Sequence, residues 1–314
     1  MRPRPGVGYG EAPGAFVASG LEIRQGAAMS DQVIVSSSDG VCEIQLNRPE
    51  KRNAITQAMY GALVDALNEA RANDGVRVVL ISGAGASFTA GNDLNDFITA
   101  DLSDENNAVR FLRLLPTFRK VLIAAVHGQT VGIGVTMLLH CDLVVAASNA
   151  QLTMPFVKLG LVPEAGSSLL LPRAIGHHRA AELLLLGKPF DAAAGLEMGI
   201  VNRVVEEKAL MEEARKLARE VAAQPPGALL TAKRLLKSET GSVAARVEEE
   251  LEAFREQLGS AEFKAAAQAF FGKSRGGGAG GGSAGGGGSA SGGGGARAEG
   301  SVSGGGSVGG GGRG

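Results

Sequence analysis

Several features that are common in proteins are scarce in this sequence. The 314 residues include no Trp, and aromatic residues make up only 4% of the chain. Its apolar content of 44% therefore comes mainly from Ala, Val and Leu, which suits the packed core of an α/β protein. The two cysteines, Cys42 and Cys141, lie far apart without a CxxC motif, so a disulfide framework is not expected. Lys and Arg total 31 against 32 Asp and Glu, and this balance argues against nucleic-acid or membrane-surface partners.

Motifs for several common chemistries are also missing. GxGxxG, GxxxxGK[ST] and GxSxG do not occur, which argues against a dinucleotide site, a phosphate-binding loop of the NTPase type and a serine-hydrolase elbow. Apolar runs such as VLIAAV are too short to span a bilayer. The four histidines do not pair at metal-ligand spacing, so we predict that they are exposed or hydrogen-bonded in the core: His127, His140, His177 and His178.

The two ends of the chain differ in composition from its middle. Residues 1–28 contain Pro and Gly without an apolar period, and Met29 begins a more ordinary stretch. We expect residues 1–28 to be a disordered leader or an upstream start-site artefact; their acidic residues and lack of a long apolar run argue against a signal peptide. Residues 276–314 are mostly Gly with Ser and Ala, so they have too little apolar surface to offset the entropy of ordering. We expect a disordered tail there, either natural or the product of a frameshift.

The first part of the middle region predicts a hairpin followed by a helix. Strand character at 32–36 and 41–46, with the turn SSDG between them, predicts the hairpin. The period of the apolar residues then predicts a helix from Gln57, capped by Thr56. The turn residues Asn73-Asp74-Gly75 end it.

Strands and helices alternate in the rest of the middle region. Short apolar segments of the buried-strand type occur at 78–82, 121–126, 143–147 and 201–205, and helices are predicted near 133–140 and 177–186. The final segment has helical periodicity throughout, interrupted at QPPG and ETGS. This order predicts an α/β core over residues 29–205 and a helical region over 206–275.

Two glycine-bearing loops each stand between a buried strand and a helix start. FTAGNDL covers residues 88–94, and HGQTVGIG covers residues 127–134. Loops of this kind can aim unpaired backbone N–H groups into a pocket. Two such groups that converge on one oxygen form an oxyanion hole, which stabilises an enolate or a tetrahedral anion. Spacing alone favours the simpler interpretation that both are ordinary tight turns.

The order of several motifs resembles the crotonase superfamily of acyl-CoA enzymes. FTAGNDL is similar to the family's first oxyanion loop, F-x-x-G-x-D-[LI], and AAVHGQTVGIGVTMLLHCDLVVAASNAQL is similar to its second segment. FVKLGLVPEAGSSLLLPRAIG resembles the substrate-pocket loop with its following helix, and GLEMGIVNRVV resembles A-x-x-x-G-[LI]-V-x-x-V. The resemblance runs from about Val33 to Lys273 in the family's order. It implies a spiral of ββα units with a helical C-terminal trimerisation region, assembled into homotrimers or homohexamers.

The resemblance also implies roles for individual residues. The oxyanion donors fall on the backbone N–H groups of Asn92 and Ile133. Contact with the CoA part of the substrate is implied for the first loop, at Ala90, Gly91, Asn92, Asp93 and Leu94. It is also implied for a basic stretch, at Arg48, Lys51 and Arg52. A helix that often reaches a neighbouring subunit carries the last two implied contacts, Phe270 and Lys273. For the basic stretch, solvated loop charge is an equally good interpretation. The family gives Asp93 a structural role in holding its loop.

The chain departs from the family's hydratases at two positions. Hydratases carry catalytic glutamates where this chain has Thr136 and Phe156, and neither side chain transfers a proton at neutral pH. A carboxylate occurs instead at Glu164 in VPEAGSS, an arrangement similar to that of peroxisomal-type Δ3,Δ2-enoyl-CoA isomerases. The resemblance therefore implies that Glu164 is the acid/base that converts 3-enoyl-CoA to 2-trans-enoyl-CoA in fatty-acid β-oxidation. An acid favoured by a helix dipole is the alternative interpretation of Glu164.

Such a 1,3-proton shift implies an acyl-CoA substrate and no separate cofactor or metal, because one base and two N–H donors suffice. Two alternatives stay open. The first is another reaction of the family, such as hydration with one carboxylate or thioester hydrolysis. The second is a non-catalytic member used for binding, for example to RNA, although no basic patch supports it. The expected compartment is the cytoplasm in a bacterium, with an organelle matrix as the eukaryotic option.

Overall fold

The larger of two β-sheets forms the centre of the protein. The computed structural model describes residues 31–98, 102–237 and 240–276. The larger sheet has the strand order β1-β2-β3-β5-β7-β10. Its strands are β1 (Val33–Ser38), β2 (Val41–Leu46), β3 (Val78–Gly83), β5 (Val121–Val126), β7 (Leu143–Ala147) and β10 (Arg203–Val205). β1 pairs antiparallel with β2 and the other neighbours pair parallel, which requires the crossover connections of an α/β protein.

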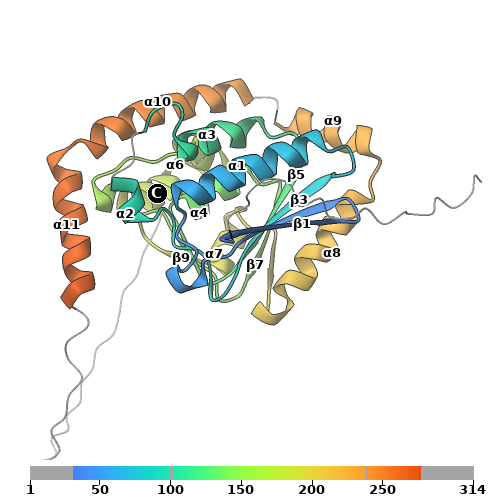
Figure 1. Cartoon of the computed structure of the whole chain (residues 1–314), viewed down its shortest axis with the longest axis horizontal. Helices are drawn as coiled ribbons and strands as arrows, with labels where there is room; N and C mark the ends of the chain where they lie inside the picture. The colour runs from blue at the N-terminus through green and yellow to red at the C-terminus, as the bar shows by residue number, and fades with distance from the viewer. Residues whose placement is uncertain (1–30, 99–101, 238–239, 277–314) are drawn as a thin grey trace, which may run out of the picture. The chain divides into compact units, whose positions relative to one another are not determined.

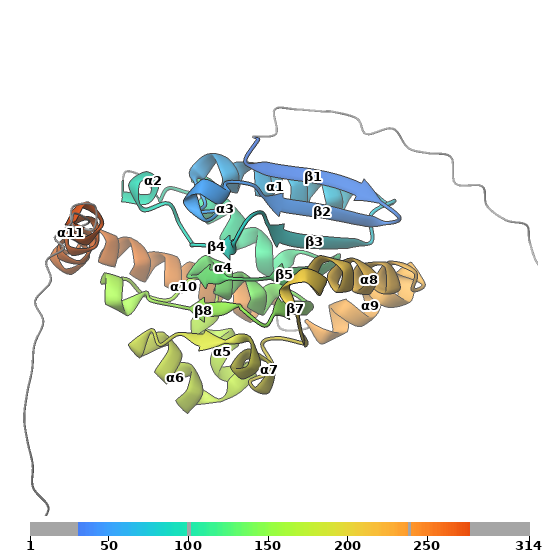
Figure 2. The same cartoon turned by 90° about the horizontal axis from the view of Figure 1, so that it is seen from below.

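A second sheet of short strands has the order β4-β6-β8-β9. Its strands are β4 (Ser87–Thr89), β6 (Gln129–Val131), β8 (Gln151–Thr153) and β9 (Phe190–Asp191). β4, β6 and β8 each follow a strand of the larger sheet directly in the chain, so the chain repeats one strand in each sheet and then helical segments. Figure 2 shows β4 and β8 at the end of the larger sheet that lies near α4. This repeat confirms the expected α/β fold of ββα units.

The helical segments fall between and after these strand pairs. The α-helices are α1 (Gln57–Ala72), α2 (Leu94–Ile98), α3 (Asn107–Leu114), α4 (Ile133–Thr136), α5 (Ser167–Ile175), α6 (His177–Leu186), α7 (Ala192–Glu197), α8 (Leu210–Ala222), α9 (Pro226–Leu236), α10 (Thr240–Leu258) and α11 (Ala261–Gly276). The short 3₁₀ turns are η1 (Pro49–Lys51), η2 (Leu115–Thr117), η3 (Met137–His140), η4 (Val157–Leu159) and η5 (Glu207–Ala209). A helical C-terminal region is therefore present, as expected.

The inner strands β3, β5 and β7 of the larger sheet are buried on both faces. Val79 and Ile81 of β3 belong to the apolar cluster that includes α1, whereas Val78 and Leu80 belong to the cluster that includes α8. Successive side chains of a strand point to opposite faces, so α1 and α8 cover opposite sides of the sheet (Figure 1). Because both faces of the inner strands are covered, β3, β5 and β7 are almost entirely apolar, and the sequence shows them as continuous apolar runs.

The hairpin and the first helix agree with the sequence predictions. β1 and β2 pair from Val33↔Leu46 to Ser38↔Val41. The helix α1 begins at Gln57, and the Thr56 hydroxyl accepts a hydrogen bond from the Met59 backbone N–H at 3.2 Å, as an N-cap does. The helix predicted near 177–186 is α6, and Gly187 follows it in a left-handed conformation.

Other elements differ from the predictions for physical reasons. The segment 133–140 is half α-helix and half 3₁₀-helix, because the chain tightens before it enters β7 only three residues later. The helix α3 and the individual strands of the second sheet were not predicted from the residue pattern, and α5 was expected only through the resemblance. Strands of two or three residues, such as β4, are too short to show the alternation that identifies a strand.

Some expectations concern residues that the structure does not describe. The expected disordered leader, residues 1–28, lies outside the described ranges. So does the expected disordered tail, residues 276–314, except for Gly276, which is the last residue of α11. Among the described helices, none is long and apolar enough to cross a bilayer. The described residues also contain no group of three or more His, Cys, Asp and Glu side chains arranged to hold a metal ion.

Candidate active site

The two glycine-bearing loops emerge from neighbouring parallel strands. β4 pairs with β6 through Ser87↔Gln129 and Thr89↔Thr130. Asn92 follows β4 by three residues, and Ile133 follows β6 by two residues as the first residue of α4. Because the carboxyl ends of parallel strands lie at the same edge of a sheet, the two loops leave that edge side by side.

Glycine lets these loops approach closely. Gly91 has φ +87°, and a Cβ atom there would lie 2.9 Å from the carbonyl oxygen of Val131 in the other loop. Gly132 has φ +56° and ψ −118°, a conformation that L-residues with side chains rarely adopt, just before the first residue of α4. The bulk of a side chain at Gly91 would therefore push the two loops apart.

The backbone around Asn92 is fixed while its own N–H group is left available. Ile55 N–H donates to the Gly91 carbonyl at 2.8 Å, and Asp93 N–H donates to the Ile55 carbonyl at 2.9 Å. Within the described part of the chain, the N–H groups of Asn92 and Ile133 donate to no protein acceptor. Both groups can therefore donate to a bound oxygen atom.

Arg48 and Asp93 form an ion pair at the base of the first loop. Arg48 Nη1 lies 2.6 Å from Asp93 Oδ2, and it also donates to the Ala54 carbonyl at 3.0 Å. Burial opposes ionisation of Asp93, but hydrogen bonds from Arg48 and the backbone outweigh it and lower the pKa of Asp93. Lys51 and Arg52 are exposed, and Arg52 donates to Gln129 Oε1 of the second loop at 3.0 Å. Arg48 is thus engaged in holding the loop, whereas Lys51 and Arg52 face solvent.

Tyr60 is a residue of the site that sequence reasoning missed. Its ring is buried on α1, and its hydroxyl donates a hydrogen bond to Asn92 Oδ1. Burial, and secondarily the charge of Glu164, raise the pKa of Tyr60 well above its usual range, so the hydroxyl stays a donor. The sequence shows only a tyrosine among the apolar residues of a helix, which gives no sign that it touches the first loop.

Glu164 is a buried carboxyl group, with only 5% of its surface exposed. Thr136 Oγ1 lies 2.5 Å from Glu164 Oε1. Thr136 is the last residue of α4, so the short helix that presents the Ile133 N–H at one end contacts Glu164 at the other. Burial raises the pKa of Glu164 to about 8; the Thr136 hydrogen bond opposes this rise and the charge of Glu250 adds to it. The carboxyl group is therefore poised to exchange a proton near neutral pH.

The remaining predicted residues have varied surroundings. Phe156 is buried. His127 Nε2 lies 2.8 Å from the Gly85 carbonyl oxygen, and His140 Nε2 lies 2.6 Å from that of Ala165, while His177 and His178 are exposed, all as predicted. Phe270 and Lys273 lie on α11, where their side chains are outside the described part of the structure.

Comparison with known proteins identifies the family. The family profile described as enoyl-CoA hydratase/isomerase matches residues 36–276. The chain therefore belongs to this family, as the resemblance to crotonases indicated. It is 35% identical over 254 residues to 1,2-epoxyphenylacetyl-CoA isomerase of Escherichia coli K12, an alignment that covers 78% of this chain and 97% of that protein.

The chain is also similar to a mammalian isomerase and to a solved bacterial structure. Enoyl-CoA delta isomerase 2 of Rattus norvegicus is 35% identical over 252 residues, covering 78% of this chain and 64% of the rat protein. Among solved structures, an enoyl-CoA hydratase/isomerase from Pseudoalteromonas atlantica T6c superimposes with a TM-score of 0.75 at 42% identity, covering 77% of this chain and 98% of that one. The protein is thus an acyl-CoA-processing enzyme of the enoyl-CoA hydratase/isomerase family.

Proposed function

We propose that the protein is an enoyl-CoA isomerase that converts 3-enoyl-CoA to 2-trans-enoyl-CoA in fatty-acid β-oxidation. The observation that carries the proposal is the buried Glu164 carboxyl group, whose pKa is raised to about 8. It is hydrogen-bonded to Thr136, the last residue of the helix that begins with Ile133. A 1,3-proton shift needs one group that removes a proton and returns it. A carboxyl group whose pKa lies near the working pH can do both.

In the proposed mechanism, ionised Glu164 removes a proton from C2 of the substrate. The electrons move into the thioester carbonyl and form a dienolate, whose oxygen accepts hydrogen bonds from the N–H groups of Asn92 and Ile133. Protonated Glu164 then returns the proton to C4, and the double bond ends between C2 and C3. The Thr136 hydroxyl stabilises the ionised carboxylate before the first transfer and keeps the group in one orientation.

Binding of the CoA part is proposed for the first loop and for the basic stretch that precedes α1. We propose that the segment Ala90–Leu94 lines the thioester and pantetheine, and that Lys51 and Arg52, which face solvent, attract the CoA phosphates. Arg48 contributes mainly through its ion pair with Asp93. Phe270 and Lys273 are proposed to contact CoA bound to a neighbouring subunit of a homotrimer or homohexamer.

Hydration is the second candidate, because the family description names both activities. Residues at the two positions where the hydratases carry glutamates argue against it: Thr136 and Phe156 are both buried and cannot activate water as a carboxylate does. The wild-type enzyme should therefore move the double bond of a 3-enoyl-CoA and add little water to a 2-enoyl-CoA. Efficient hydration without isomerisation would overturn the proposal.

The Glu164→Gln variant tests the catalytic role directly. It keeps the size of the side chain and removes the base, so isomerase kcat should fall by roughly 10²–10⁴-fold while the affinity for CoA esters changes little. In the wild type, kcat/KM should rise with pH and level off above about 8, because Glu164 must be ionised to take the first proton. Glu212→Gln, an exposed change on α8, is the control and should retain full activity. A Glu164→Gln enzyme with near wild-type turnover would rule out this residue as the base.

A further inference from the structure

Two buried titratable residues that the proposed mechanism does not use contact the turn just after Glu164. Glu250, on α10, is 6% exposed, and its carboxylate accepts hydrogen bonds from Gly166 N–H at 2.5 Å and from Ser168 N–H at 2.9 Å. The His140 ring, at the end of η3, lies 2.6 Å from the Ala165 carbonyl oxygen through Nε2. A carbonyl oxygen only accepts, so Nε2 carries the proton in this contact. The backbone of the turn is therefore held from two elements that are distant in sequence.

The turn that they hold has an unfavourable backbone conformation. Ala165 has φ +58° and Gly166 has φ +70°, so two successive residues are left-handed and the first carries a side chain. A left-handed conformation is unfavourable for an L-residue, because its Cβ atom comes too close to the following carbonyl oxygen. Such conformations persist where surrounding contacts over-determine them, and they cluster at functional sites. The Glu250 and His140 hydrogen bonds are contacts of this kind.

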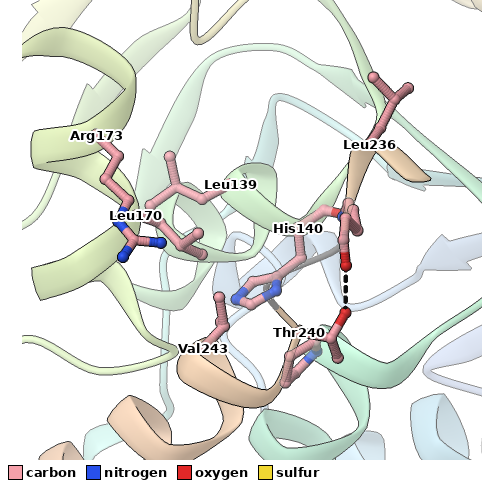
Figure 3. Close-up of a pocket in the computed structure, with 9 residues that line it drawn as sticks. Leu139, His140, Leu170, Arg173, Leu236, Thr240 and Val243 are labelled. Atoms are coloured by element: carbon pink, nitrogen blue, oxygen red, sulfur yellow. Dashed lines mark hydrogen bonds between the residues drawn. The ribbon is translucent and has the colours of Figure 1, made fainter. Parts of the chain in front are cut away.

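The side of α10 that carries Glu250 also packs against the turn. A Cβ atom at Gly166 would lie 3.1 Å from Val243 Cγ1 and 3.6 Å from Val247 Cγ2, both on α10. A cavity of about 360 Å³ adjoins this contact, with His140 of η3, Leu170 of α5 and Val243 of α10 in its wall (Figure 3). Its lining does not include Glu164, Asn92 or Ile133. This cavity is therefore separate from the proposed reacting residues.

We propose that Glu250 is a positioning residue for the Glu164 base. Glu250 binds the N–H groups of Gly166 and Ser168, and His140 binds the Ala165 carbonyl. Together these contacts hold the strained turn that orients the Glu164 carboxyl group. The inference rests on the proposed function, since it needs Glu164 to be the acid/base. It assigns a catalytic consequence to the C-terminal helix α10, although α10 supplies no reacting group.

Glu250 also acts on Glu164 through its charge. Among the described residues, the charged or titratable groups near the pair include Tyr60 from α1, His140 from η3 and Arg246 from α10. Arg246 Nη1 lies 3.3 Å from Ser168 Oγ. Burial keeps the pKa of His140 low, at about 4, so His140 is neutral at working pH. The negative charge of Glu250 raises the pKa of Glu164, so loss of that charge moves the ionisation of Glu164 to lower pH.

The experiment compares two substitutions at Glu250 with a matched control on the same helix. Glu250→Gln removes the charge and one of the two acceptor oxygens, whereas Glu250→Asp keeps the charge but retracts it by one methylene group. Glu252→Gln removes an exposed charge two residues away and should leave kcat and its pH profile unchanged. Isomerase kcat, KM and the pH profile of kcat/KM are measured for each variant and the wild type, with circular dichroism and sedimentation to confirm the fold and assembly.

For Glu250→Gln we expect kcat to fall by about ten- to a hundredfold with little change in KM, because a small displacement of a catalytic group has an effect of this size. The rising limb of its pH profile should move to lower pH. For Glu250→Asp, kcat should fall while the limb stays near that of the wild type. A Glu250→Gln enzyme with wild-type kcat, or with a limb that stays or moves upward, would overturn the proposal. So would failure of both Glu250 variants to fold while Glu252→Gln folds normally.

The same series separates this inference from the proposed function. Loss of activity in Glu164→Gln with no effect of Glu250→Gln rejects only the positioning role. Absence of isomerisation by the wild type rejects the proposed function, and the Glu250 variants are then compared on the acyl-CoA ester that the wild type does convert.

Discussion

The two glycine-bearing loops and the Glu164 turn are held in place by different means. The loops follow β4 and β6, which pair with each other, and backbone hydrogen bonds and glycines fix their approach. The Glu164 turn is held by side chains from elsewhere: Thr136 and His140, 28 and 25 residues before their partners, and Glu250, 84 residues after Gly166. Backbone pairing between strands sets the positions of the two loops, whereas the position of the turn depends on how separate helices pack.

This difference suggests how the enzyme family can change its chemistry. An oxyanion hole needs only backbone N–H groups, so it survives side-chain changes such as Asn at position 92. The acid/base needs a particular side chain in a particular environment. We expect that a carboxyl group placed on a different element would change the reaction and leave the loops intact.

Among changes in the two loops, the largest expected loss of turnover comes from a side chain at Gly91. In Gly91→Ala the new Cβ would lie 2.9 Å from the Val131 carbonyl oxygen at a residue with φ +87°, so the two loops must separate. Loss of one oxyanion donor lowers turnover by about 10²–10³-fold, and we expect isomerase kcat to fall by this amount. Gly199→Ala is the control, because Gly199 has φ +77° with no atom within 4 Å of a new Cβ and is not part of the site. It should lower the melting temperature without lowering kcat. Equal losses of kcat in the two variants would show that turnover does not depend on the close approach of the two loops.

The burial of Glu164 should instead make the free energy of unfolding of the protein depend on pH. Burial raises the folded-state pKa of Glu164 from 4.5 to about 8. Between these values the folded protein keeps a proton that the unfolded chain has lost, so the free energy of unfolding falls as pH rises and levels off above about 8. Glu164→Gln removes this fall. Measured by urea unfolding at equal protein concentration, the variant should gain stability over the wild type from pH 5 to pH 8, by at most about 5 kcal/mol. Parallel pH curves for the two proteins would contradict the raised pKa.

The smallest expected effect tests the contact between a helix and the first loop. Tyr60→Phe removes the hydroxyl that donates to Asn92 Oδ1 and keeps the ring, which packs against Phe111 at a centroid distance of 5.4 Å. One such hydrogen bond contributes about 0.5–1.5 kcal/mol, so kcat should fall by roughly two- to tenfold. Asn92→Ala keeps the backbone N–H, and the double variant should lose no more than the larger single loss. Fully additive losses would show that the two side chains act independently.

The sequence predicted the parts of the fold and site that depend on neighbours in the chain. The hairpin, the Thr56 cap and the buried strands show themselves through short-range periodicity and turn residues, and the glycine loops show themselves as motifs between a strand and a helix. Glu164 was identified as a candidate through resemblance and through the absence of acids at positions 136 and 156. The sequence pattern did not predict the short strands, because β4, β6 and β8 have only three residues each.

By itself, the sequence determined that this chain forms an α/β core with two glycine-bearing loops and a carboxyl group in the VPEAGSS segment, because each of these is a local pattern. Only the tertiary structure decided what surrounds that carboxyl group. The contacts of Tyr60 with Asn92, Thr136 with Glu164, and Glu250 with Gly166 join residues 32, 28 and 84 positions apart. Such contacts arise when sheets and helices pack, and packing also removes the water that would otherwise leave Glu164 an ordinary acid.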